Sequence, residues 1–266
     1  MTAPVYLGID IGSLAVKVAL IDAQGGLMGR AVASAGYDGR QIAEGLVHEL
    51  LEEQGLAADE VAYAVATGYG RVRFDAASEE VSEITCHALG AFHANPETRT
   101  VIDIGGQDSK AMRLDSQGRV VDFAMNDRCA AGTGRFLEVM AAALGVRLED
   151  LGDLALASRH PTVVSNTCTV FAESEAISQM ARGAAREDVA AGLHRAIASR
   201  VLGLAGRMGL MPDVALTGGV ALNRAVCAAL EELSGQIFRV PCEPQLMGAL
   251  GAALFAARKG RRRAQL

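Results

Sequence analysis

The chain has 266 residues, of which 50% are hydrophobic, and a formal net charge of −6. This length exceeds the roughly 100–200 residues of one domain and predicts one large or two modest domains with packed cores. The acidic balance excludes general nucleic-acid binding, which favours a strongly basic surface. No apolar run reaches the roughly 18–20 residues of a membrane span, and the start MTAPVYLGIDIG lacks a basic region before an apolar signal core, so we expect a cytoplasmic protein.

The first part of the chain predicts three strands, a helix, a fourth strand and a second helix. Apolar and β-branched runs between turn signals indicate the strands, and the first two form a hairpin that turns at Gly12-Ser13. Apolar residues at helical spacing indicate the helices. Asn95-Pro96 is the expected domain boundary. The predicted strands are 6–9, 16–21, 27–33 and 61–67, and the predicted helices are 41–54 and 79–94.

The remaining chain begins in the same way, with three strands before its helices. A second hairpin is predicted to turn at Gly105-Gly106. The helices that follow are indicated by apolar periodicity and by glycines at their ends. The predicted strands are 100–104, 110–114, 120–125, 214–217 and 236–240, and the predicted helices are 135–144, 170–182, 188–208, 223–233 and 247–259.

The two parts share a repeat. Identities at one fixed offset favour an internal duplication over chance. We therefore predict two related α/β domains, 1–97 and 98–266, with a cleft between them. The repeated residues are Asp10, Ile11, Gly12, Lys17, Asp22, Gln24 and Gly25 in the first copy and Asp103, Ile104, Gly105, Lys110, Asp115, Gln117 and Gly118 in the second.

Each copy offers a turn suited to phosphate. The sequence has no GxxxxGK followed by Ser or Thr, so a P-loop is excluded. Small or missing side chains at Gly12-Ser13 and Gly105-Gly106 let backbone N–H groups approach an anion. Asp10 and Asp103 precede these turns, and two carboxylates opposite one another across a cleft suit Mg²⁺. The alternative is that both turns are ordinary hairpins with exposed lysines.

Three motifs resemble those of the acetate and sugar kinase, heat-shock chaperone and actin superfamily. DIGS corresponds to its first phosphate motif, DIGGQD to its second and TGGVALN to its adenosine motif. The resemblance implies two ribonuclease-H-like domains that hold ATP between them, with closure of the cleft coupled to hydrolysis. Lys17 is suited to neutralise a phosphate, and Gln107 with Asp108 to orient water at the γ-phosphate.

The site residues follow from these motifs. The predicted catalytic residues are Asp10, Asp103 and Gln107. The predicted phosphate contacts are Gly12, Ser13, Ala15, Lys17, Gly105, Gly106, Gln107 and Asp108. The residues predicted to meet the nucleoside are Gly218, Gly219 and Asn223, with Gln245 and Gly248 nearby.

Two of the five cysteines precede segments that are predicted to be helical: Cys129 in NDRCAAGTGRF and Cys168 in SNTCTVFAESE. A helix N-terminus favours a thiolate and the negative charge of a thiolate-bound iron-sulfur cluster. Neither cysteine belongs to a CxxC pair, so the spacing alone is equally consistent with structural thiols. The five histidines form no ligand-spaced cluster, and packing or surface roles are expected for His48, His87, His93, His160 and His194.

Longer motifs resemble the activators of 2-hydroxyacyl-CoA dehydratases, in the BadF/BadG/BcrA/BcrD ATPase family. These motifs are SEITCHA, IDIGGQDSK, NDRCAAGTGRFLEVMA, TCTVFAESE and GALGAA, and they extend through almost the whole chain. That family also includes the ATP-hydrolysing subunits of benzoyl-CoA reductases. One departure is Leu14, which stands where the family has a threonine, and it predicts slower ATP turnover because a hydroxyl contact to phosphate is lost.

The family resemblance implies a homodimer that shares one 4Fe-4S cluster. Such a cluster takes four cysteines, so Cys129 and Cys168 of each subunit would supply half. Cys86, Cys227 and Cys242 are expected to be buried, inert thiols. The implied partners are a reduced ferredoxin or flavodoxin and a dehydratase or related acyl-CoA reductase.

The leading hypothesis is thus an ATP-dependent one-electron donor that reduces a partner 2-hydroxyacyl-CoA dehydratase. One alternative within the family is the ATPase subunit of a benzoyl-CoA reductase. Two alternatives from other classes are a small-molecule kinase that uses the same cleft and a nucleotide-gated binding module. Both of these require no iron, and the chain has no evident acceptor subdomain or substrate-holding extension.

Overall fold

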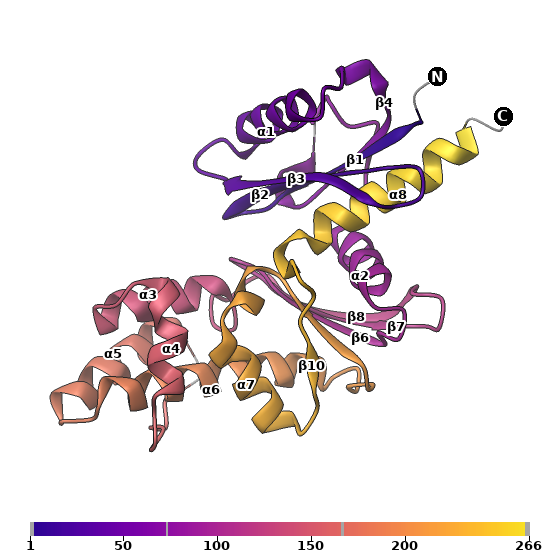
Figure 1. Ribbon diagram of the computed structural model, residues 1–266. Helices are drawn as coiled ribbons and strands as arrows, with labels where there is room; N and C mark the ends of the chain where they lie inside the picture. The colour runs from indigo at the N-terminus through magenta and orange to yellow at the C-terminus, as the bar shows by residue number, and fades with distance from the viewer. Residues whose placement is uncertain (1–2, 73, 166–167, 264–266) are drawn as a thin grey trace. The chain divides into compact units, whose positions relative to one another are not determined.

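A computed structural model describes residues 3–72, 74–165 and 168–263 (Figure 1). Contacts within the chain divide it into two compact units. Unit 1 comprises Met1–Thr98, Leu114–Val120 and Gln245–Leu266, and unit 2 comprises Arg99–Arg113 and Val121–Pro244. Within the described ranges, no helix combines the length and apolar character needed to cross a membrane.

Unit 1 is built on a mixed five-stranded sheet. Its strands are β1 (Val5–Ile11), β2 (Ala15–Ile21), β3 (Leu27–Ser34), β4 (Val61–Thr67) and β5 (Glu79–Glu80). The order in space is β3-β2-β1-β4-β5. β1 and β2 form the predicted hairpin, β3 continues it antiparallel, and β4 joins β1 in parallel on its other side. The sheet thereby brings the end of β4 beside the turn that follows β1.

Helices cover both faces of this sheet (Figure 1). They are α1 (Gly39–Glu53), α2 (Glu83–Ala94) and α8 (Met247–Arg263), with short 3-10 turns η1 (Ala58–Glu60) and η2 (Tyr69–Arg71). Successive strand residues point to opposite faces. Ile9 of β1 therefore packs in the core that contains Leu50 of α1, whereas Tyr6 packs in the core that contains α8. Asp38 begins α1 by accepting hydrogen bonds from the N–H groups of Arg40 and Gln41.

α8 lies directly against β1 because glycines leave room for its backbone. A side chain at Gly8 of β1 would overlap the carbonyl of Ala249 in α8. A side chain at Gly251 of α8 would overlap the carbonyl of Cys86 in α2. Contact between backbones at this range needs glycine. The motif GALGAA at 248–253 thus determines how α8 meets both neighbours.

Unit 2 repeats the sheet of unit 1. Its strands are β6 (Thr100–Ile104), β7 (Ser109–Leu114), β8 (Val120–Asn126), β9 (Val214–Thr217) and β10 (Phe238–Arg239). β6 and β7 form an antiparallel hairpin, and β9 joins β6 in parallel on its other side. The order β10-β9-β6-β7-β8 is the order of unit 1 written in reverse, strand for strand. The topology therefore confirms the duplication that the sequence repeat predicts.

The helices of unit 2 enclose one large core. They are α3 (Gly134–Leu144), α4 (Leu151–Leu156), α5 (Thr169–Ala181), α6 (Arg186–Ala205) and α7 (Arg224–Ser234), with 3-10 turns η3 (Leu148–Asp150) and η4 (Gly219–Leu222); a third, η5 (Pro244–Leu246), leads into α8. Phe136 and Met140 of α3 pack in this core with Ile197 of α6 and Ile102 of β6. The helix that follows the second hairpin is therefore anchored on the sheet that carries the hairpin.

The structure differs from the predicted elements at the start of α2 and at α4. The helix predicted at 79–94 begins at Glu83, because Ser82 caps it and Glu79 is held in β5 by Lys259 of α8. The short helix α4 has no counterpart among the predicted elements. Its few residues offer too short a periodic pattern to be read as a helix.

The compact units also divide the chain differently from the predicted domains. The prediction assigned 245–266 to the second domain, whereas its helix α8 packs with β1, β4 and α2 of unit 1. The physical reason is the glycine contact described above, which pairs Gly8 with the α8 backbone. Sequence order alone does not reveal that the last segment of the chain packs in unit 1.

Candidate functional site

The turn after β1 holds a buried carboxylate beside a half-buried lysine. Asp10 lies opposite Lys17 in the hairpin, and the Lys17 Nζ is 3.2 Å from the Asp10 Oδ2. The N–H of Gly12 donates to the carbonyl of Ala15 at 3.1 Å and closes the turn. A methyl group added at Gly12 would lie 3.1 Å from the Lys17 Nζ, so this ammonium group sits next to the turn. The lysine side chain remains 16% exposed.

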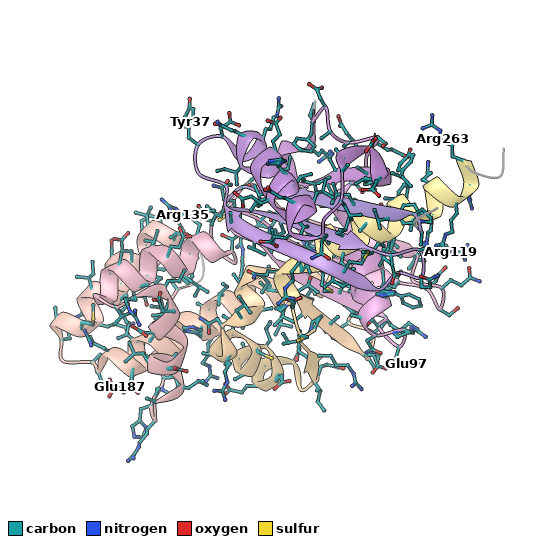
Figure 2. All side chains as sticks on the ribbon, turned by 45° about the horizontal axis from the view of Figure 1, so that its top comes forward. Tyr37, Glu97, Arg119, Arg135, Glu187 and Arg263 are labelled. Atoms are coloured by element: carbon teal, nitrogen blue, oxygen red, sulfur yellow. The ribbon has the colours of Figure 1, made fainter. Side chains whose placement is uncertain are left out.

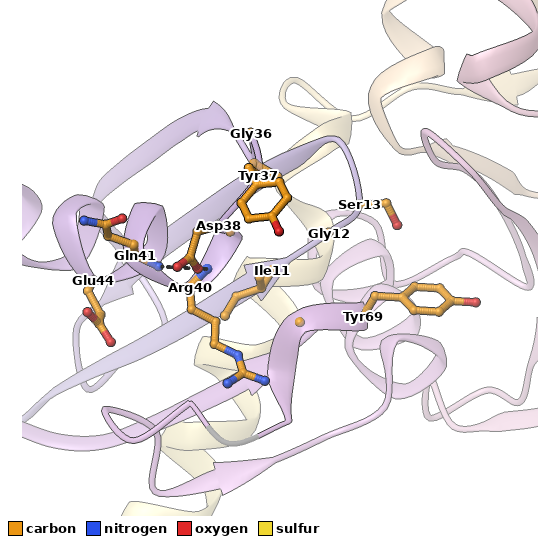
Figure 3. A pocket seen from close by; sticks show the side chains of 13 residues that line it. Ile11, Gly12, Ser13, Gly36, Tyr37, Asp38, Arg40, Gln41, Glu44 and Tyr69 are labelled. Atoms are coloured by element: carbon orange, nitrogen blue, oxygen red, sulfur yellow. Dashed lines mark hydrogen bonds between the residues drawn. The ribbon is translucent and has the colours of Figure 1, made fainter.

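A cavity of about 830 Å³ opens in unit 1 beside this turn (Figure 3). The end of β1, the start of α1 and the 3-10 turn after β4 line it. Figure 3 shows the rings of Tyr37 and Tyr69 and the side chain of Ser13 around it, with Arg40 at the start of α1. The first phosphate turn thus borders a space large enough for a small molecule.

The turn after β6 is more tightly bonded. The N–H of Gly105 donates to the carbonyl of Asp108 at 2.9 Å. Lys110 is buried, with its Nζ 2.5 Å from the Asp108 Oδ2 and 3.5 Å from the Asp103 Oδ2. The hydroxyl of Thr217 donates to the Asp103 Oδ1 at 2.9 Å. Lys110 and Thr217 therefore fix the carboxylates of this turn.

A Thr-Gly pair follows the parallel strand of each unit and supports the turn beside it. Gly68 and Gly218 have φ values of 89° and 87°, which L side chains rarely adopt. A methyl group added at Gly68 would lie 2.7 Å from the Asp10 Oδ1, and one at Gly218 would lie 2.9 Å from the Asp103 Oδ1. The sequence analysis found only the second pair, because the two pairs do not share the offset of the repeat. The sequence signal that could have found both pairs is a Thr-Gly at the end of a buried strand.

The residues of the predicted adenosine motif are brought together in unit 2. Gly218 donates its N–H to the carbonyl of Pro244 at 2.9 Å, and Gly219 begins η4. The Asn223 Oδ1 accepts hydrogen bonds from the N–H groups of Ala225 and Val226, which caps α7. Gln245 is half-buried in the 3-10 turn before α8 and belongs to unit 1. The contacts of these residues with a nucleoside stay a prediction.

Asn223 is also bonded to a buried histidine, for which the sequence predicts only a packing or surface role. The Asn223 Nδ2 lies 3.0 Å from the His194 Nε2, and the His194 Nδ1 lies 2.8 Å from the carbonyl of Ala190. Burial lowers the pKa of His194, which keeps the ring neutral. In that state Nδ1–H donates to Ala190 and Nε2 accepts from Asn223. The asparagine is therefore held by α6 and α7 together.

The second phosphate turn is joined by hydrogen bonds to the start of α3. The N–H of Gly134 donates to the carbonyl of Gly105 at 2.8 Å, and the N–H of Arg135 donates to the carbonyl of Gly106 at 2.8 Å. The Arg135 side chain, labelled in Figure 2, pairs with Glu138 on the helix surface. The two N–H groups at the first turn of the helix are thus satisfied by the phosphate turn itself.

The segment 127–133, between β8 and α3, contains Cys129. The Asn126 Nδ2 donates to the carbonyls of Cys129 and Ala131, at 2.9 Å and 3.2 Å, and holds the segment at the end of β8. Cys129 therefore lies in a bonded loop that precedes α3, as the predicted helix at 135–144 implies, and not at the first residue of the helix. Cys168 is the residue that precedes α5, so its predicted place at a helix start is confirmed.

The other three cysteines differ from one another. Cys86 is fully buried, as predicted, and burial raises the pKa of its thiol to about 12. Cys227 is half-buried, and its thiol pKa is also raised by burial. Cys242 is exposed, so the prediction of a buried thiol is wrong there, because the residue lies in the loop after β10. The described residues contain no group of three or more His, Cys, Asp or Glu side chains that could hold a metal ion.

The chain is similar to proteins of one known family over most of its length. Residues 7–256 match the model of the BadF/BadG/BcrA/BcrD ATPase family. The chain is 45% identical over 250 residues to an activator of lactoyl-CoA dehydratase from Anaerotignum propionicum, and the match covers 94% of this chain and 96% of that protein.

Two solved structures have the same fold over their full length. Component A of (R)-2-hydroxyglutaryl-CoA dehydratase from Acidaminococcus fermentans has a TM-score of 0.94 and 43% identity, and the match covers 97% of this chain and 100% of that one. The activator of 2-hydroxyisocaproyl-CoA dehydratase from Clostridium difficile, with bound ADPNP, has a TM-score of 0.92 and 41% identity, with 98% and 97% covered. These likenesses confirm the predicted α/β fold.

Proposed function

The chain belongs to the BadF/BadG/BcrA/BcrD ATPase family, and from that premise we propose that it is an ATP-dependent one-electron donor that activates a 2-hydroxyacyl-CoA dehydratase. In this function ATP is hydrolysed to ADP and phosphate. One electron enters from a reduced ferredoxin or flavodoxin, and the same electron leaves to the dehydratase. We also propose that the protein is cytoplasmic and forms a dimer.

The two turns are the proposed phosphate contacts. The N–H groups of Gly12 and Gly105 close their turns, so the residues that follow them, Ser13 and Gly106, are better placed to meet oxygen atoms of ATP. Lys17 adds a positive charge beside the first turn. Asp10 and Asp103 are the proposed carboxylates for Mg²⁺, and a hard cation of this kind fits such oxygen donors and neutralises phosphate charge.

The observation that carries the proposed coupling is the pair of hydrogen bonds between the second turn and α3. The carbonyls of Gly105 and Gly106 accept from the first two N–H groups of that helix. A change of the turn on nucleotide hydrolysis therefore moves the start of α3, and with it the loop that holds Cys129. This is a direct path through one bonded segment, in which Asn126 holds the other end.

Cys129 and Cys168 are the proposed ligands of a 4Fe-4S cluster, which when bound supplies one-electron storage. Both are half-buried and accessible to a partner, whereas Cys86 is sealed in the core. A cluster needs four thiolates, so two cysteines per chain fit a cluster shared by two copies. Val170 and Phe171, in the first turn of the helix after Cys168, are 65% and 66% exposed. Such an apolar surface suits burial against a second copy.

Iron analysis of anaerobically purified protein tests this proposal. We expect about four iron atoms and about four acid-labile sulfides per dimer, with absorbance that bleaches on dithionite reduction. Cys129→Ala and Cys168→Ala are each expected to lose the iron and to keep nucleotide binding. Cys242→Ala is the matched control, because this exposed thiol lies outside the proposed ligand set. Iron retained in Cys129→Ala or Cys168→Ala would contradict the assignment.

A small-molecule kinase is the second candidate, and the cavity in unit 1 favours it. This space borders Gly12 and Ser13, where an acceptor would lie next to a transferred phosphate. Transfer of phosphate from ATP to a panel of sugars and carboxylic acids, tested on iron-free protein, distinguishes the two functions. Transfer without iron supports the kinase, whereas ATP hydrolysis without any phosphorylated product supports the electron donor.

A further inference from the structure

His87 is a buried histidine that the sequence analysis assigned to packing. It lies on α2 and is 5% exposed. The glycine contacts of unit 1 determine where it points, because α2 meets α8 backbone to backbone at Gly251 and at Gly90. Because no side chains separate the two helices there, α2 packs closely against the N-terminal turn of α8. This packing places His87 near the end of β1.

At this place the imidazole lies near the carboxylate that precedes the first turn. A methyl group added at Gly248 would lie 2.7 Å from the His87 Nε2 and 2.9 Å from the Asp10 Oδ2. Both atoms therefore border the same small space, which the missing side chain of Gly248 leaves open. Both belong to unit 1, as does Gly248.

The two oxygens of Asp10 have different surroundings. The Oδ2 accepts a hydrogen bond from the Lys17 Nζ and faces Gly248 and His87. The Oδ1 faces Gly68, whose added methyl group would lie 2.7 Å away, and it is the oxygen nearer to Gly12. The Asp10 Oδ2 thus faces Gly248 and His87, and the Asp10 Oδ1 faces the turn at Gly12.

The equivalent carboxylate of unit 2 has two donors. Asp103 accepts from the Lys110 Nζ on one oxygen and from the Thr217 hydroxyl on the other. In unit 1 Lys17 supplies the first donor, and the His87 Nε2 is placed to supply a second. A buried carboxylate held by two donors keeps one orientation, which favours catalysis and metal binding.

We propose that His87 is a positioning residue, which donates from Nε2 to the Asp10 Oδ2 and so directs the Asp10 Oδ1 toward Mg²⁺ bound with ATP. This inference rests on the proposed nucleotide site and adds a residue to it. His87 acts through Asp10 and does not contact the nucleotide. Its loss therefore weakens the contribution of Mg²⁺ to nucleotide binding and leaves metal-free binding as it is.

The test is the Kd of ADPNP with Mg²⁺ and with EDTA, measured by calorimetry on the full chain. Wild-type protein is expected to bind more tightly with Mg²⁺. In His87→Ala we expect the ratio of the two Kd values to fall about tenfold or more, as for other residues that orient metal ligands. In His87→Gln we expect most of the ratio to be kept, because the glutamine Nε2 can take the place of the imidazole nitrogen.

Two further variants separate this role from a loss of packing. Gly248→Ala keeps the imidazole but places a methyl group in the space that the His87 Nε2 and the Asp10 Oδ2 both border, so the ratio should fall as in His87→Ala. His194→Ala removes an equally buried histidine from unit 2, and it should change both Kd values by the same factor. Thermal unfolding identifies any variant that does not fold, and Gly248→Ala then carries the test.

The outcomes are distinct. A wild-type ratio in both His87→Ala and Gly248→Ala would overturn the role of His87 and leave the proposed nucleotide site intact. A wild-type protein that binds ADPNP equally well with and without Mg²⁺, or not at all, would overturn the proposed site and the role of His87 with it.

Discussion

The two turns that are predicted to bind phosphate come from one repeat, yet they hold their charges differently. In unit 2, Lys110 is buried between Asp103 and Asp108, whereas in unit 1, Lys17 pairs with Asp10 and keeps 16% of its side chain exposed. Ala15 stands where the second copy has Asp108. One missing carboxylate thus leaves the first lysine able to meet a phosphate, while the second lysine is committed to its neighbours.

The turns also differ in what they are bonded to. The second turn holds the start of α3 through two backbone hydrogen bonds, and the first turn borders an open cavity. The shared Asp, Gly and Lys residues therefore do not decide the role of a turn, because the residues around them differ. We call the turn at Gly105-Gly106 the braced turn and the turn at Gly12-Ser13 the accessible turn.

The largest effect should come from Lys110→Met, which leaves two buried carboxylates without their cation. We expect the free energy of unfolding to fall by about 3–5 kcal/mol, measured by urea unfolding. Lys17→Met is the matched control, and its loss should be smaller because one carboxylate is affected and His87 remains beside it. Equal losses in the two variants would contradict the distinction between a braced and an accessible turn.

Lys17→Met should instead act on the nucleotide. A hydrogen bond to a charged group contributes about 1.5–3 kcal/mol, so the Kd of ADPNP with Mg²⁺ should rise about tenfold to a hundredfold. Lys17→Arg keeps the positive charge and should show a smaller rise. An unchanged Kd in Lys17→Met, measured by calorimetry, would remove Lys17 from the site.

The next largest effect is the change in stability with pH that the buried His194 causes. Burial lowers the pKa of this residue, so the unfolded chain binds a proton below about pH 6.5 while the folded state stays neutral. Stability should therefore fall as the pH is lowered through that range, by up to about 1.4 kcal/mol per pH unit. Urea unfolding at several pH values checks this slope. His194→Gln should have a weaker slope, and the same slope in both proteins would rule out His194 as its source.

Much of this architecture could be predicted from local sequence. The hairpins around Gly12 and Gly105 carry strong turn signals, and the repeat fixes which strands correspond. The carboxylates Asp10 and Asp103 follow from the same pattern, since both end up buried at the ends of paired strands. These features depend on residues close together in the chain, which is where sequence patterns are informative.

The features that were missed depend on contacts between distant segments. His87 lies near Asp10 because Gly248 and Gly251 let α8 approach α2. The burial of Lys110 depends on Asp108 folding back over Gly105, which the repeat does not reveal. Cys242 was expected to be buried from its residue type, yet the loop after β10 exposes it. In each case tertiary packing decides what composition leaves open.

We propose that the second turn transmits the state of the nucleotide to Cys129 through α3. Proline suits the first position of a helix but carries a ring carbon in place of the N–H, so Gly134→Pro removes the hydrogen bond to the Gly105 carbonyl and its ring crowds that oxygen. Gly134→Ala adds a side chain at the same place but keeps the N–H, and it serves as the control.

The measurement is the electron paramagnetic resonance spectrum of the dithionite-reduced protein before and after addition of ADPNP with Mg²⁺. The account predicts a spectral change in wild type and Gly134→Ala and none in Gly134→Pro, although all three bind the nucleotide. A Gly134→Pro spectrum that responds as wild type does, or a wild-type spectrum without any iron-sulfur signal, would contradict it.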